Sequence, residues 1–254
     1  MSLEVGILFD STLCIGCKAC SIACKQSHNL PGEPNPDELD AETFTIVKEK
    51  DGIFCRNFCR HCLEPACASA CPVGALHKTS HGPVLYDSAK CIGCRYCIVA
   101  CPYNIPRYQW SKQSPLVRKC DFCKELLAQG KEPACANVCP TGATKFGIRE
   151  DLLAEARERL KSKPDAYFQH IFGEKEVGGS SVLIISAQHI SEFGIPVPKI
   201  TSPLPDLTAS YLNKVPAIVA GGGLFLAGIW WLTRRKNQVK KDERQSEQKK
   251  NSRE

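Results

Sequence analysis

The sequence predicts an α+β fold whose interior is organised by cysteine side chains, followed by one C-terminal transmembrane helix. Three observations lead to this prediction. Sixteen of the 17 cysteines fall into four closely spaced runs, short strand and helix patterns separate the runs, and a long uncharged segment lies near the C-terminus. A chain of 254 residues suffices for one or two domains, but here cysteine loops replace much of the usual aliphatic packing.

Two of the cysteine runs have the spacing C-x2-C-x2-C-x3-C, which is typical of bacterial ferredoxins. The other two stretch the second interval to four and to eleven residues. Three cysteines so spaced can wrap one loop around three corners of a [4Fe–4S] cubane, while the fourth binds a neighbouring cluster. The sixteen candidate ligands are Cys14, Cys17, Cys20 and Cys24; Cys59, Cys62, Cys67 and Cys71; Cys91, Cys94, Cys97 and Cys101; and Cys120, Cys123, Cys135 and Cys139.

Because each fourth cysteine serves a partner cluster, the runs must come in pairs. Four runs therefore predict four [4Fe–4S] clusters in two bacterial-ferredoxin-like dicluster modules. Four oxidised cubanes with sixteen thiolates would contribute a charge of about −8, which more than offsets the formal net charge of +6. Basic residues in or beside the runs are expected to compensate part of that charge, with tuning of the cluster potentials as the more specific alternative. They are Lys18, Lys25, Arg60, Lys90, Arg95, Arg118, Lys119 and Lys124.

The cysteine spacing fits disulfide bonds and zinc sites less well than clusters. Triplets two residues apart place thiols too regularly for sensible disulfide bridging. Zinc prefers two separated C-x2-C pairs, a pattern that the fourth run could supply but that leaves a surplus thiolate in the first and third. Cys55 is expected to be a non-ligand thiol, because Cys59 to Cys71 complete their run. His61 is expected beside a cluster and not on it, since a Rieske-type centre needs two histidines.

The segments between the runs predict short regular elements. Strands are expected at Ile7–Asp10 and Val182–Ser186, a hairpin around Ser80–Pro83, and a helix over Glu150–Lys161. Residues 28–50 begin with a stretch rich in proline, asparagine and acidic side chains, and we expect them to form a surface insertion.

The uncharged segment Val215–Thr233 is nineteen residues long, at the short end of what crosses a bilayer. Trp230 and Trp231 near its end, followed by basic residues, favour a membrane helix. A buried core helix or a re-entrant segment is the alternative, because Gly221–Gly223 lower helix propensity. Small residues at four-residue spacing would allow a second membrane helix to approach closely.

These patterns divide the chain into four parts. They are a four-cluster domain (1–165), an extension and linker (166–210), a transmembrane helix (211–236) and a charged tail (237–254).

The charge of the C-terminal end predicts orientation. Residues 234–254 carry nine Lys or Arg against four Asp or Glu, which predicts a cytoplasmic tail and a periplasmic cluster domain. The first ten residues show neither a signal sequence nor a twin arginine. We therefore expect export attached to a partner that carries the signal; without such a partner, the domain would face the cytoplasm.

The whole chain resembles the four-cluster iron–sulfur (beta) subunits of membrane-bound respiratory hydrogenase and formate dehydrogenase complexes, especially the hydrogenase-associated type with a C-terminal anchor. The resemblance is carried by DSTLCIGCKACSIAC, CRHCLEPACASACPVGAL, KCIGCRYCIVACPYNIPRYQW, KCDFC with PACANVCPTGATKFG, and HIFGEKEVGGSSVLIIS. The missing export signal is unusual for the hydrogenase type and favours a molybdopterin partner. The EKEVGG stretch is unusual for formate dehydrogenase subunits and favours the hydrogenase type.

The resemblance implies how the clusters are shared. Cys139 would join Cys14, Cys17 and Cys20; Cys24 would join Cys120, Cys123 and Cys135; Cys101 would join Cys59, Cys62 and Cys67; and Cys71 would join Cys91, Cys94 and Cys97.

The resemblance also implies a role. The chain would be an electron-transfer subunit at the bacterial inner membrane and not an enzyme by itself. Its partners would be a catalytic nickel–iron hydrogenase or molybdopterin formate dehydrogenase subunit and an integral-membrane quinone-reacting or cytochrome b subunit. Nucleic acid is not expected as a partner. A free-standing membrane-anchored polyferredoxin and a zinc-binding scaffold are the alternatives.

Overall fold

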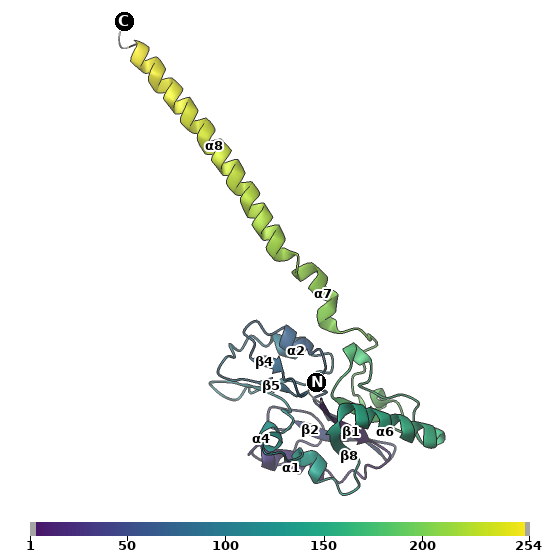
Figure 1. Cartoon of the computed structure of the whole chain (residues 1–254). Coiled ribbons are helices and arrows are strands. Elements are labelled where there is room, and N and C mark those ends of the chain that lie inside the picture. The colour runs from purple at the N-terminus through teal and green to yellow at the C-terminus, as the bar shows by residue number, and fades with distance from the viewer. Residues whose placement is uncertain (1–3, 252–254) are drawn as a thin grey trace. The chain divides into compact units, whose positions relative to one another are not determined.

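The computed structural model describes residues 4–251 and divides the chain after Leu207 into two compact units. The first unit mixes short strands with short helices, and the second consists of helix (Figure 1). The predicted α+β class with one apolar C-terminal helix is confirmed. Residues 166–207, predicted as an extension and linker, lie in the same unit as the cysteine runs.

The first unit contains a three-stranded sheet in the order β8-β1-β9. Strand β1 (Val5–Asp10) lies in the middle, antiparallel to β8 (Thr144–Ile148) and parallel to β9 (Val182–Ile185). The sheet therefore joins the segment before the first cysteine run to segments that follow the last run. Strands β1 and β9 lie where the sequence predicted them.

Helix α6 (Arg149–Ser162) covers one face of this sheet. Its buried residues Leu152, Leu153, Ala156 and Leu160 pack with Leu8 of β1 and with Leu183 and Ile185 of β9. Successive side chains of a strand point to opposite faces, so Ile7 and Phe9 face the other way and pack among Cys55, Phe58, Phe122 and Cys135. The sheet thus separates α6 from the cysteine loops.

The first module holds the first and fourth cysteine runs. Helix α1 (Ala19–Ser27) packs against α5 (Ala134–Asn137), and α4 (Lys124–Ala128) lies between the second and third cysteines of the fourth run. Strand β2 (Thr45–Lys50) forms an antiparallel hairpin with β3 (Ile53–Phe58).

This hairpin corrects the predicted surface insertion over residues 28–50. Phe44 and Ile46 are buried in a hydrophobic cluster, together with Leu39 from the proline-rich stretch. The end of the segment is therefore part of the core. The sequence prediction missed this because the preceding residues 33–42 are mostly polar and acidic.

The second module holds the second and third runs. Helices α2 (Ala66–Ser69) and α3 (Tyr96–Val99) pack together beside two hairpins. The predicted hairpin around Ser80–Pro83 is confirmed, because β4 (Leu76–Lys78) pairs antiparallel with β5 (Val84–Tyr86). The second hairpin is formed by β6 (Arg107–Tyr108) and β7 (Val117–Arg118). Three 3-10 turns complete the unit: η1 (Pro164–Ala166), η2 (Glu176–Gly178) and η3 (Ile190–Phe193).

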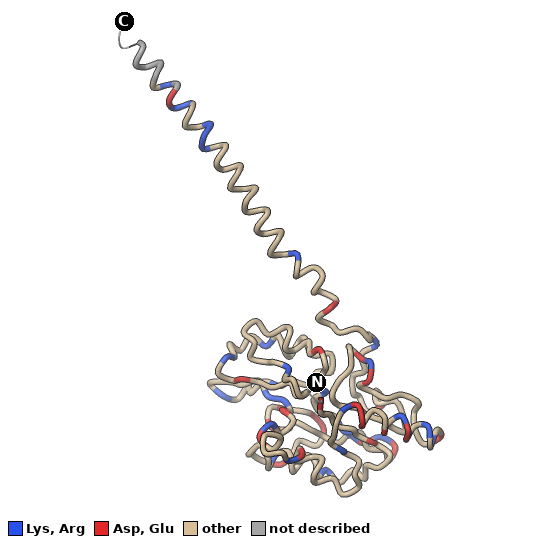
Figure 2. The backbone as a smooth tube through the Cα atoms, in the orientation of Figure 1, with Lys and Arg blue, Asp and Glu red and all other residues tan. Residues whose placement is uncertain are grey.

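The second unit carries α8 (Val215–Asn251), preceded by α7 (Leu204–Leu212), which begins before the division. The helical stretch Leu204–Asp242 contains a window of mean hydropathy 1.8, so its length and composition allow it to cross a membrane. Figure 2 shows a long part of α8 without charged positions, followed by clustered Lys and Arg.

Candidate metal centre

The structure gathers the cysteines into four sets, and each set draws on two runs. In each module, the last cysteine of one run lies with the first three of the other. The sets are Cys14, Cys17, Cys20 and Cys139; Cys24, Cys120, Cys123 and Cys135; Cys59, Cys62, Cys67 and Cys101; and Cys71, Cys91, Cys94 and Cys97. The members of the last set also line one small cavity. These are the groupings that the resemblance implied.

The four sets form a row. Cys20 of the first run has Cys135 as a neighbour, Cys120 has Cys59, and Cys67 has Cys97. The two inner sets share one hydrophobic cluster, in which Cys24 and Cys120 pack with Cys59. The contact between Cys120 and Cys59 therefore joins the two modules.

All four runs bend their loops at the same position, directly before their second cysteine. The residue there has a positive φ in every run: 70° at Gly16, 49° at His61, 72° at Gly93 and 65° at Phe122. Glycine adopts this conformation readily, whereas other residues are strained by it. A Cβ atom at Gly16 would also overlap the ring of Phe54.

His61 and Phe122 occupy these strained positions in the two inner loops. Their rings pack edge to face with centroids 4.5 Å apart, and both side chains are almost fully buried. The two modules therefore meet through equivalent residues of equivalent loops. An alignment of the four runs by their cysteines would have shown that His61 and Phe122 stand where the other two runs have glycine.

The fourth cysteines of the second and fourth runs lie in cages of backbone amides. Burial alone would raise the pKa of Cys71, but N–H groups of residues 73–76 point at its sulfur and lower the pKa overall. Burial would raise the pKa of Cys139, but the amides of Thr141, Ala143 and Thr144 and the hydroxyl of Thr141 lower it overall. Both cages follow the same motif, CP-x-GA, and both favour the thiolate form that binds metal.

Other members of the sets are held as neutral thiols when no metal is bound. Burial, with a smaller effect of neighbouring sulfurs, raises the pKa of Cys67 to about 12 and that of Cys97 to about 11. Binding of a metal must therefore displace protons from these thiols. A cation in the centre of each set would supply the charge that keeps four close sulfurs as thiolates.

Arg56 and Lys119 are buried cations beside the sets. Arg56 is 1% exposed; its Nε donates to Oγ1 of Thr45 at 2.7 Å, and its charge interacts with Cys20 and Cys135. Lys119 is 6% exposed, and its Nζ donates to the carbonyls of Val84 and Cys120. These positive charges are placed to offset negative charge in the interior of the row.

The described residues fit a polynuclear cluster better than single metal ions. A tetrahedral zinc site with bonds of 2.3 Å would bring its sulfurs to about 3.8 Å from one another. Within residues 4–251, no three Cys, His, Asp or Glu side chains form a group that could hold one metal ion. Buried N–H groups of Arg60 and His61, next to Cys59 and Cys62, also lack a partner in the described part of the protein. The four thiols of each set are the donor group that a cubane requires.

Cys55 lies outside the four sets. It is fully buried in the cluster that includes Cys14 and Cys135, and burial raises the pKa of its thiol to about 12. Its role as a non-ligand stays a prediction.

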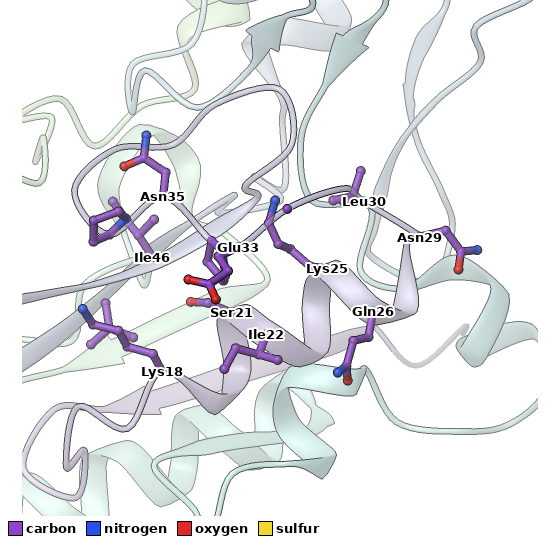
Figure 3. A pocket seen from close by; sticks show the side chains of 14 residues that line it. Lys18, Ser21, Ile22, Lys25, Gln26, Asn29, Leu30, Glu33, Asn35 and Ile46 are labelled. Carbon is purple, nitrogen blue, oxygen red and sulfur yellow. The ribbon is translucent and has the colours of Figure 1, made fainter.

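A groove of about 780 Å³ runs along α1 on the side of Lys18, Ser21 and Lys25 (Figure 3). No cysteine lines it. The groove is therefore separate from the cysteine sets, although both are built on the same helix.

Comparison with known proteins identifies the family. The family model of the 4Fe-4S dicluster domain matches residues 50–149. A protein of Nitratidesulfovibrio vulgaris (strain Hildenborough) is 38% identical over 255 residues, covering 94% of this chain and 69% of that protein. The hydrogenase-2 operon protein HybA of Escherichia coli O157:H7 is 37% identical over 239 residues, covering 76% of this chain and 73% of HybA.

The iron–sulfur subunit of nitrate-inducible formate dehydrogenase from Escherichia coli K12 is 36% identical over 201 residues, covering 72% of this chain and 68% of that subunit. The iron–sulfur subunit of formate dehydrogenase from Haemophilus influenzae is 34% identical over 255 residues, covering 89% of this chain and 79% of that subunit. The chain belongs to this family of 4Fe-4S iron–sulfur electron-transfer subunits, together with HybA and the iron–sulfur subunits of formate dehydrogenases.

Proposed function

We propose that the sixteen cysteines of the four runs hold four [4Fe–4S] clusters, and that the chain relays single electrons through them. The observation that carries this proposal is the exchange of last cysteines between runs, combined with the row that the four sets form. A cubane accepts one electron at a time. Four cubanes in a row would let electrons pass from one end of the domain to the other.

The two ends of the row carry exposed apolar side chains, which suit partner subunits. Val99, near Cys97 and Cys101, is 87% exposed, and Trp110 is 71% exposed. Large exposed apolar side chains are typical of protein interfaces. Those near the outer set of the second module are Val73, Ile92, Tyr96, Val99 and Trp110, and those near the outer set of the first module are Leu13, Ile15, Ile22 and Val138.

We infer that the partners are a catalytic nickel–iron hydrogenase or molybdopterin formate dehydrogenase subunit at one end and an integral-membrane quinone-reacting or cytochrome b subunit at the other. The names of the relatives support a catalytic subunit of either kind. The chain itself would carry electrons and leave bond chemistry to its partner.

We propose that residues 211–236 cross the inner membrane once, between the four-cluster domain (1–165) with its extension (166–210) and a cytoplasmic tail (237–254). Arg234 and Arg235 lie over the rings of Trp230 and Trp231, at 5.1 and 5.4 Å. Such pairs suit an interface where aromatic rings meet charged headgroups. The basic tail supports a periplasmic cluster domain.

Metal analysis of the full-length chain, isolated anaerobically from membranes with its partners, tests the proposal. We expect about sixteen iron and sixteen acid-labile sulfide per chain, and coupled cubane signals in the electron paramagnetic resonance (EPR) spectrum of the reduced protein. About four zinc and no sulfide would contradict the proposal and support the scaffold alternative. Stoichiometric isolation without any partner would favour the free-standing polyferredoxin.

Protease accessibility tests the orientation separately. In spheroplasts, an epitope tag at the C-terminus should be protected and the cluster domain accessible. An accessible tag with a protected cluster domain would instead place the domain in the cytoplasm.

A further inference from the structure

The loop Cys59–Cys62 contains two buried side chains whose N–H groups have no protein acceptor. Arg60 is 3% exposed, and its Nη1 and Nη2 lack a hydrogen-bond partner among the described residues. Its guanidinium lies 6.0 Å from the ring centre of Phe58 and 5.6 Å from that of Tyr103. Aromatic rings attract a cation but accept no conventional hydrogen bond from its outer nitrogens.

The charge of Arg60 is also uncompensated by protein. Arginine stays protonated in proteins, yet no carboxylate pairs with Arg60 within the described residues. The groups whose charges act on it are Tyr103 and the thiols of Cys55, Cys59 and Cys62. A buried charge requires a counter-charge, and thiolates at Cys59 and Cys62 would supply one beside Arg60.

His61 presents a third donor. Its Nδ1 accepts a hydrogen bond of 2.9 Å from the backbone N–H of Val84, so its proton is on Nε2. That Nε2 is buried and has no partner in the part of the chain that the structure describes. The side chain is 1% exposed, so bulk solvent does not reach it.

The other three runs have no such donors at these two positions. The equivalent pairs are Ile15 and Gly16, Ile92 and Gly93, and Asp121 and Phe122. None of these residues carries a side-chain N–H, and Asp121 is paired with His28 at 2.7 Å. Among the four runs, the second therefore differs at these two positions by a buried positive charge and three donor atoms without a partner among the described residues.

We propose that Arg60 and His61 donate to the sulfur atoms of the cluster that Cys59, Cys62, Cys67 and Cys101 would hold, and thereby raise its reduction potential above that of its neighbours. This rests on the proposed function, since the acceptors are cluster sulfurs. Hydrogen bonds and a nearby positive charge bind the more negative, one-electron-reduced state more strongly than the oxidised state. The inner position of this set would make it a site where an electron rests between the two ends.

A potentiometric titration of the full-length chain with its clusters, followed by EPR, tests the inference. Arg60→Met removes the charge and the donors while keeping a long apolar side chain. We expect one of four potentials to fall by about 59 mV or more, a tenfold change in the one-electron equilibrium. His61→Phe keeps a ring at this position, as in Phe122, and should lower the same potential by a smaller amount.

Lys161→Met is the control. Lys161 is exposed to solvent on α6, which the sheet separates from the cysteine loops, so its charge is screened and the four potentials should stay unchanged. The hyperfine coupling of the exchangeable proton on His61 Nε2 should be lost in His61→Phe and kept in the control.

The outcomes separate this inference from the proposed function. Wild-type chain without iron and sulfide would overturn the proposed function itself. Full iron content with four unchanged potentials in Arg60→Met would overturn only the role of Arg60 and His61. If Arg60→Met does not retain iron, the potentials are measured in His61→Phe and in the charge-conserving Arg60→Lys instead. Unchanged potentials in both variants would overturn the inference.

Discussion

The assignment of cysteines to sets can be tested by paired substitution. Cys71 belongs by sequence to the run of Cys62, but in the structure it lies with Cys94 of the next run. The double variant Cys71→Ser/Cys94→Ser therefore removes two ligands from one set. The double variant Cys71→Ser/Cys62→Ser removes one ligand from each of two sets.

The expected magnitudes follow from one cubane per set. Each cubane holds four iron atoms, so Cys71→Ser alone should lower iron from about sixteen to about twelve per chain. The same-set double variant should also retain about twelve, because the second substitution acts on a cluster already lost. The cross-set double variant should retain about eight.

Iron and acid-labile sulfide per chain, with spin quantitation of the reduced protein, provide the assay. Cys55→Ser is the control and should retain all iron, since Cys55 lies outside the four sets. The reasoning is refuted if the same-run pair, Cys71 and Cys62, behaves like a single substitution while the pair of Cys71 and Cys94 loses two clusters.

Three further predictions concern the frame around the clusters. Gly16→Ala should destabilise the first loop by about 1 kcal/mol or more and lower iron by one cubane, because φ is 70° and the added Cβ has no space. Gly32→Ala, at φ 67° in open space, should retain all iron. Asp10 is fully buried and accepts hydrogen bonds from the side chains of Thr12, Tyr167 and Arg159. Asp10→Ala should therefore lower the free energy of unfolding by about 3 kcal/mol, measured by anaerobic denaturant unfolding. Glu155→Ala removes a more exposed ion pair with Arg159 and should lower the free energy of unfolding by less than about 1 kcal/mol. Ending the chain after Leu207 should release a protein with full iron content into the soluble fraction, and its retention in membranes would show a second attachment.

The apolar part of α8 and the cysteine sets place different demands on the chain. The two inner sets lie in a hydrophobic cluster, where they pack with Ile105 and Val177 from distant parts of the chain. The helix needs only length and low charge. This difference explains why local composition was enough to predict the helix, while the surroundings of the clusters were not visible in composition.

Much of the site could be predicted from the sequence because iron–sulfur ligation is local. Spacings of two and three residues decide which cysteines can bind neighbouring irons of one cubane. The sixteen candidate ligands could therefore be recognised from the four runs alone. Strand β1 and the hairpin around Ser80–Pro83 were equally visible, since alternation and turn residues act within a few positions. Hairpin β2–β3 was missed, because polar residues 33–42 masked Phe44 and Ile46, whose burial depends on partners far along the chain.

The spacing of the cysteines did not determine which distant segments pack against one another. Which run exchanges its last cysteine with which other run is decided by packing that brings Cys101 to Cys62, and the residues alone suggested it only through resemblance. Tertiary structure also decided that His61 and Phe122 fill the junction between the modules and that Arg60 is buried without a partner. The physical reason is range: a coordination motif is determined by neighbours in the chain, whereas burial and electrostatics are determined by neighbours in space.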